Sequence, residues 1–104
     1  MDKKTDNLIK AFINSAAMEY PLKKVFLFGS YAKKSNITSS SDIDIALIID
    51  NLNDDDKFDA QIKLFLIAAK FDSRIEPHPL SNQDFNINNP FASEIQKTGI
   101  EIKF

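Results

Sequence analysis

Cysteine is absent from this sequence of 104 residues, which excludes a disulfide framework, a thiolate metal site and a cysteine nucleophile. Histidine occurs once, at His78 between two prolines, so the sequence shows no histidine cluster and we expect this residue in a loop, structural or facing solvent. An excess of positive charge is also missing, because 13 basic residues stand against 15 acidic ones. This balance disfavours polymerase-like binding to an extended nucleic acid.

Long apolar segments are lacking as well. The first ten residues, MDKKTDNLIK, contain no apolar signal segment, and the longest apolar runs are too short to cross a bilayer. We therefore expect a cytoplasmic protein with no membrane partner. The length predicts a single domain over residues 1–104 without room for a separate substrate domain, so that recognition needs a partner.

The apolar pattern predicts helices alternating with strands around a small mixed sheet, an α/β or α+β fold. Thr5 is the expected N-cap of a first helix, and a buried strand covers residues 25–28. A helix over residues 57–70 should place its large apolar side chains in the core. These are Phe58, Ile62, Phe65, Leu66 and Ala69.

The last third of the chain predicts three further elements. A short strand over residues 74–76 should stop at Pro77, because proline cannot donate to a sheet ladder. Asn89 and Pro90 predict the start of a helix with Phe91 and Ile95 facing the core, and Gly99 predicts its end. Residues 100–104 then alternate as an edge strand, with Ile100, Ile102 and Phe104 on its buried face.

Two aspartates stand at the start of a second buried strand that runs to residue 49. Since strand side chains alternate between faces, Asp42 and Asp44 share one side, and Ile43 and Ile45 lie on the core side. Ala46 continues the aspartate side as an apolar residue, so both carboxylates sit at the mouth of a buried strand. Such a pair repels itself unless a cation joins it.

A glycine-serine turn follows the first strand. Gly29 either makes a tight turn with positive φ or lets a ligand approach the backbone. Ser30 either caps the helical turn that follows or donates to a phosphate, and Lys33 lies one turn further on, within reach of the same anion. Lys33 and Lys34 can equally be a solvated surface pair. Residues 35–41 form a polar loop that returns the chain to the sheet.

Two other acidic features carry alternatives. Glu76 is either a salt-bridge partner of Arg74 or the third member of a carboxylate cluster with Asp42 and Asp44, because its strand should lie beside theirs. The acidic run over residues 50–56 suits the start of a helix. A calcium loop is the sharper alternative for this run, but the internal glycine and later glutamate are absent.

Together, Gly29-Ser30, eleven intervening residues and then Asp42-Ile43-Asp44 in a strand resemble the signature of the polymerase-beta-type nucleotidyltransferase superfamily, in its minimal branch. The resemblance implies that Gly29, Ser30 and Lys33 hold a nucleoside triphosphate. It also implies that Asp42, Asp44 and Glu76 are catalytic and bind two magnesium ions. The third acid of the family is often aspartate, so Glu76 departs from it.

The resemblance implies transfer of AMP from ATP, or of another nucleoside monophosphate, to a hydroxyl of a partner. In the minimal branch that partner is a helical HEPN-type toxin, which the nucleotidyltransferase neutralises as its antitoxin. One alternative is a non-catalytic module that neutralises its partner by contact, and another modifies a small molecule such as an aminoglycoside. A homo-oligomer is compatible with both, and a purely structural domain fits the paired aspartates least.

Overall fold

The computed structural model describes residues 3–33, 41–86 and 88–104, so Lys34 and the predicted loop over 35–40 lie outside the described residues. The elements, in chain order, are α1 (Lys3–Glu19), β1 (Leu22–Phe28), α2 (Ser30–Lys33), β2 (Ile43–Ile49), α3 (Asp54–Ala69), β3 (Ile75–Ser81), α4 (Pro90–Thr98) and β4 (Ile100–Glu101). The predicted alternation of helices and strands is confirmed. No helix in the described ranges is long and apolar enough to span a membrane.

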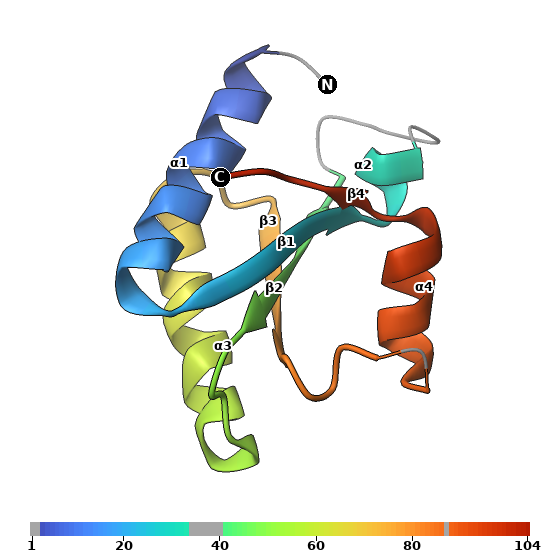
Figure 1. Cartoon of the computed structure of the whole chain (residues 1–104). Helices are drawn as coiled ribbons and strands as arrows, with labels where there is room; N and C mark the ends of the chain where they lie inside the picture. Colours follow the sequence, from blue (N-terminus) through green and yellow to red (C-terminus); the bar gives the residue numbers. More distant parts are fainter. Residues whose placement is uncertain (1–2, 34–40, 87) are drawn as a thin grey trace.

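A mixed sheet forms the centre of the molecule, with strand order β3-β2-β1-β4. β1 pairs antiparallel with both β2 and β4, while β2 and β3 run parallel. α1 and α3 lie on one face of the sheet and α4 lies on the other (Figure 1). This is the predicted mixed sheet with helices packed on it, an α+β fold.

Each face of the sheet carries its own apolar cluster, as the alternation along β2 predicts. Ile43, Ile45, Leu47 and Ile49 face α1 and α3, and all four are at most 1% exposed. Ala46 and Ile48 face α4 and share a cluster with Ile95 of that helix. Asp44 therefore projects on the α4 side of the sheet, where the apolar residues of β2 give way to carboxylates.

The predicted core face of α3 is wrong. Phe58, Ile62, Phe65, Leu66 and Ala69 are exposed, and the residues that pack on the sheet are Ala60, Leu64, Ile67 and Ala68. The helix thus packs on the sheet through two alanines, one leucine and one isoleucine, and its phenylalanines lie on the opposite side. The first turn of α3 is Asp54, Asp55 and Asp56, so these aspartates lie in the helix, where its dipole favours negative charge.

Two predictions at the first helix and third strand are also wrong. Thr5 lies inside α1 and is buried, so it is not the N-cap. β3 continues through both prolines to Ser81, because it is an edge strand and Pro77 turns its peptide away from β2. The Pro77 carbonyl instead accepts a 2.6 Å hydrogen bond from Gln61 of α3.

The caps of α4 are as predicted, but the C-terminal side chains are not. The Asn89 side chain accepts hydrogen bonds from the backbone N–H groups of Phe91 and Ala92, and Gly99 is the C-cap. Phe91, however, is 39% exposed while Ile95 is buried. The predicted edge strand is reduced to Ile100–Glu101, and of its expected buried side chains Ile100 and Phe104 are exposed.

Candidate functional site

Two carboxylates from neighbouring parallel strands meet at one end of the sheet. Asp44 of β2 is directly opposite Glu76 of β3 in the strand register. Both side chains lie on the α4 face, since Ala46 and Leu80 continue that face along the two strands. Asp42, immediately before β2, lies close enough to Glu76 to raise the pKa of its carboxyl. The structure therefore brings together the three acids predicted from the sequence.

Crowding of negative charge perturbs Glu76. Burial raises the pKa of the Glu76 carboxyl, and the neighbouring Asp42 side chain and the charge of Asp44 raise it further, while His78 acts in the opposite direction. A carboxyl with a raised pKa is held toward the neutral form when no cation is present. Carboxylate oxygens of this kind are the ligands that Mg²⁺ prefers, so the donor set fits a hard divalent cation.

Gly29 lies directly against the Asp44 carboxylate of this cluster. Its φ is +73°, the left-handed region that favours glycine, so the turn alternative is confirmed. A Cβ at this position would lie only 2.5 Å from Asp44 Oδ2. The glycine is therefore needed both for the backbone conformation and for the space that the Asp44 carboxylate occupies. Its backbone lies against the acidic cluster, which also suits the second alternative, close approach of a ligand.

His78 belongs to the site although the sequence argument placed it in a loop. It lies in β3, and its Nε2 is 3.1 Å from Asp44 Oδ1. Asp44, Glu76 and His78 each offer a ligand atom within 4.8 Å of the others. The signal for it in the sequence was its spacing, because a residue two after Glu76 in a strand must share the face of Glu76.

An aromatic surface adjoins the carboxylates. The Phe28 ring packs edge-on against His78 with centroids 5.0 Å apart, and against Phe91 of α4 at 5.4 Å. His78 and Phe91 are 5.9 Å apart. Phe91 is 39% exposed, so the aromatic group presents an accessible ring beside Asp44. The exposure of Phe91 contradicts its predicted core role and leaves its ring accessible to a planar ligand.

Ser30 and Lys33 lie on α2, the single helical turn after Gly29, and both are exposed. The Gly29 carbonyl accepts a 3.1 Å hydrogen bond from the Lys33 backbone N–H, which ties the turn to the glycine. The sequence pattern thus places the serine hydroxyl next to Gly29 and Lys33 one turn away. Each is accessible to an anion that approaches the Asp44 cluster.

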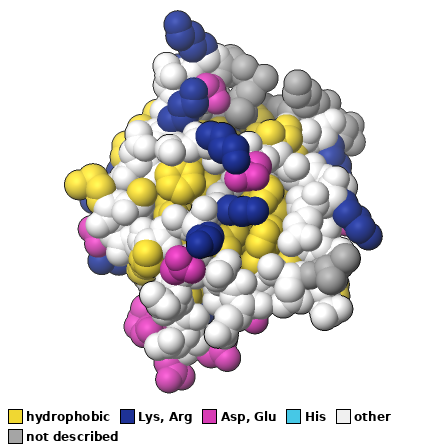
Figure 2. Space-filling model, in the orientation of Figure 1, with side chains coloured by type: hydrophobic (Ala, Val, Ile, Leu, Met, Phe, Trp, Pro, Cys, Tyr) yellow, Lys and Arg dark blue, Asp and Glu magenta, His cyan; other side chains and the backbone are white. Residues whose placement is uncertain are grey.

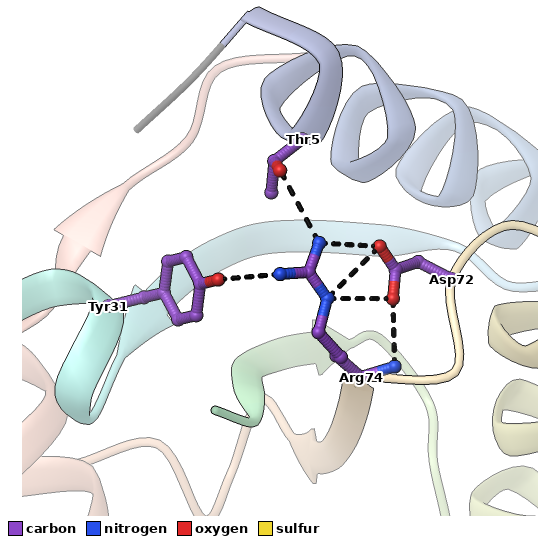
Figure 3. Close-up of polar contacts among 4 residues, drawn as sticks. All are labelled: Thr5, Tyr31, Asp72 and Arg74. Atoms are coloured by element: carbon purple, nitrogen blue, oxygen red, sulfur yellow. Dashed lines mark hydrogen bonds and ion pairs between the residues drawn. The ribbon is translucent and has the colours of Figure 1, made fainter. Parts of the chain in front are cut away.

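A polar network around Arg74 connects this turn to the rest of the fold (Figure 3). The Arg74 guanidinium makes an ion pair with Asp72 at 2.7 Å and donates to the Tyr31 hydroxyl at 2.8 Å and to Thr5 Oγ1 at 3.4 Å. Tyr31 is the second residue of α2. Arg74 therefore pairs with Asp72, and among the described residues no ion pair joins it to Glu76, the other partner the sequence suggested. This arrangement holds α2 against α1 and the start of β3.

A separate depression lies at the other end of the sheet. Its volume is about 430 Å³, and the loops after β2 and β3 line it. The lining includes Asp50, Asp54 and Asp84 with several amides, and no lysine or arginine. A triphosphate would meet only negative and neutral groups there, whereas Lys33 lies on the turn that follows Gly29, so the Asp44 cluster is the better candidate for phosphate chemistry.

Comparison with known proteins gives the same assignment. The family model "Polymerase beta, Nucleotidyltransferase" matches residues 9–103. A presumed protein adenylyltransferase from Methanocaldococcus jannaschii is 36% identical over 84 residues, which cover 78% of this chain and 82% of the relative. The crystal structure of a presumed nucleotidyltransferase from Sulfolobus solfataricus superimposes with a TM-score of 0.64 at 20% identity. That superposition covers 91% of this chain and 76% of the other, and it shows a shared fold.

Proposed function

Because the chain belongs to the polymerase-beta nucleotidyltransferase family, we propose that it transfers AMP from ATP to a hydroxyl of a partner protein. The observation that carries the proposal is the convergence of Asp42, Asp44 and Glu76 beside the positive-φ Gly29. The name of the archaeal relative, a protein adenylyltransferase, supports AMP as the group and protein as the acceptor.

In this proposal Asp42, Asp44 and Glu76 hold two Mg²⁺ ions, which supply charge neutralisation and an acidified acceptor hydroxyl when bound. Asp44 lies between Gly29 and Glu76, at the centre of the residues that would hold the metal. His78 is a positioning residue, because its ring fixes one Asp44 oxygen and imidazole is a poorer ligand than carboxylate for magnesium.

The triphosphate would lie along the turn formed by Gly29, Ser30 and Lys33. The serine hydroxyl donates to a phosphate oxygen, and the Lys33 ammonium neutralises charge on the leaving pyrophosphate. The adenine would stack on the exposed ring of Phe91, since aromatic faces bind bases of any sequence.

The reaction forms one bond and breaks one. The acceptor oxygen attacks the α-phosphorus, the bond from that phosphorus to the bridging oxygen breaks, and pyrophosphate leaves with the bonding electrons. In this proposal the Glu76 carboxylate, beside the acceptor hydroxyl, takes up the acceptor proton. Alignment of the two oxygens supplies much of the acceleration.

A HEPN-type toxin is the proposed acceptor, on the ground of the resemblance of this chain to the minimal branch of the family. The test uses ATP labelled at the α-phosphate, Mg²⁺ and a lysate of the source cell, with wild type compared with Asp44→Asn. We expect one labelled protein band with wild type and none with the variant. ATP labelled at the γ-phosphate should label nothing in the same position, and equal labelling from both nucleotides would contradict AMP transfer.

Neutralisation by contact alone makes a different prediction for Asp42→Ala. If toxin neutralisation in cells survives this substitution while labelling is lost, the partner is inhibited by binding rather than by modification. Loss of both activities in a folded variant supports catalytic neutralisation. Asp42 is exposed, so we expect Asp42→Ala to fold as wild type does. Circular dichroism checks this.

A further inference from the structure

The outward face of α3 is apolar over most of its length. Phe58, Ile62, Phe65 and Leu66 are 72%, 44%, 54% and 60% exposed. Their spacing of four, three and one residues puts them on one side of a helix of 3.6 residues per turn, opposite the buried side that packs on the sheet. Large exposed apolar residues gathered on one helix face mark an interaction surface.

The charges of the same helix are divided along its axis. Its first half contains Asp54, Asp55, Asp56 and Asp59 with Lys57. Its second half contains Lys63, which pairs with Glu19 of α1, and is followed by Lys70. Acidic side chains gather at the lower end of the molecule, over the start of α3 (Figure 2). The helix macrodipole has the complementary direction, positive at the start and negative at the end. Two such helices therefore attract each other when they run antiparallel.

We propose that a second copy of this chain packs on the protein through α3, with the two helices antiparallel about a two-fold axis at Ile62. Ile62 is midway in the sequence between Phe58 and Leu66, and also midway between Asp54 and Lys70. An axis at this residue sets Phe58 near the partner's Leu66, and it brings Asp54 to the same level along the helix as the partner's Lys70. The same axis position thus brings apolar side chains near apolar side chains and the acidic start of one helix to the basic end of the other, as a two-fold interface requires.

A second copy fits better than an unrelated protein because the surface complements itself. The proposal is independent of the proposed chemistry, since α3 and the Asp44 cluster lie on opposite faces of the sheet and both sites stay open in the dimer. A contact made by one helix from each copy is small for a protein interface, so the expected dissociation constant is in the micromolar range.

The first test is sedimentation velocity over a range of micromolar concentrations. Wild type should pass from monomer to dimer, and Phe65→Asp should remain monomeric because a carboxylate would be buried at the centre of the contact. Phe104→Asp is the matched control, since Phe104 is 58% exposed but lies outside α3, and it should dimerise as wild type does. A monomeric wild type, or equal loss of dimer in both variants, would overturn the proposal.

The second test fixes the direction of the helices. Asp54→Lys and Lys70→Asp each place two like-charge pairs in a homodimer and should weaken it about tenfold. Mixed in equal amounts they restore both opposite-charge pairs, so native mass spectrometry should show the heterodimer in excess over either homodimer. Circular dichroism verifies folding of each variant. A statistical mixture of dimers would refute the antiparallel register, and a wild type that binds only a different protein would refute self-association.

Discussion

Replacement of Gly29 by alanine tests whether the turn and the acidic cluster act as one unit. Gly29 has a φ of +73°, and its missing side chain leaves room for the Asp44 carboxylate. A left-handed residue with a Cβ costs about 1–2 kcal/mol of folding free energy. For a domain of this size that corresponds to a melting temperature lower by about 4–16 °C.

The steric effect falls on the site itself. The new Cβ would lie 2.5 Å from Asp44 Oδ2, where ordinary contacts begin near 3.4 Å, so the carboxylate must move by about 1 Å. A displacement of that size in a catalytic group lowers turnover about 100-fold. We therefore expect Gly29→Ala to lose both the proposed AMP transfer and most of the rise in melting temperature that the proposal expects from Mg²⁺ and ATP together.

Asn51→Ala is the matched control. Asn51 also has a positive φ, 61°, but it lies in the turn after β2, at the opposite end of the strand from Asp44. Asparagine tolerates the left-handed conformation better than alanine, so this substitution should also lower the melting temperature, and it should leave transfer and the Mg²⁺ effect unchanged. If Gly29→Ala keeps wild-type turnover and wild-type stabilisation by Mg²⁺, the inference that Gly29 protects the Asp44 position is wrong.

Three further substitutions extend the account. Arg74 lowers the pKa of Asp72, so the stabilising effect of the pair is present above the ordinary pKa of 3.8 and is lost as the pH falls. Asp72→Asn should therefore cost about 2 kcal/mol at neutral pH and converge with wild type in acid, as urea unfolding at both pH values would show. The pKa of Glu76 is raised, so without metal the stability that its neutral carboxyl provides is lost as the pH rises. Glu76→Gln should therefore melt higher than wild type at neutral pH in EDTA and gain nothing from Mg²⁺. An unchanged melting temperature would count against the burial and crowding of the three acids. Phe91→Ala should raise the KM for ATP about tenfold with little change in kcat, whereas an equal KM for both proteins would exclude base stacking on this ring.

Much of the site follows from local rules in the sequence. Alternation along β2 correctly predicts Asp44 on one face and Ile43 and Ile45 on the other. The prediction that the strand of Glu76 lies beside β2 is also confirmed, and with it the meeting of the three acids. Each of these predictions depends on strand periodicity and on the order of elements, which short-range patterns determine.

The remaining features depend on tertiary packing. α3 has two apolar faces, and its periodicity favours the one with large side chains, although the sheet receives Ala60 and Leu64. β3 passes through its prolines because its position at the edge removes the need for their N–H groups. His78 joins Asp44 for the same reason, since only the continued strand turns its ring toward β2.

Paramagnetic relaxation by Mn²⁺, a close substitute for Mg²⁺, tests most directly whether the acidic cluster of β2 and β3 holds a divalent cation. In amide NMR spectra of the isotope-labelled protein with an ATP analogue, the cluster predicts strongest broadening at Gly29, Asp44 and Glu76 and little at residues 50–54 and 81–84. Glu76→Gln should reduce the effect. Strongest broadening in the two loops at the opposite end of the sheet, or equal broadening along the chain, would contradict the account.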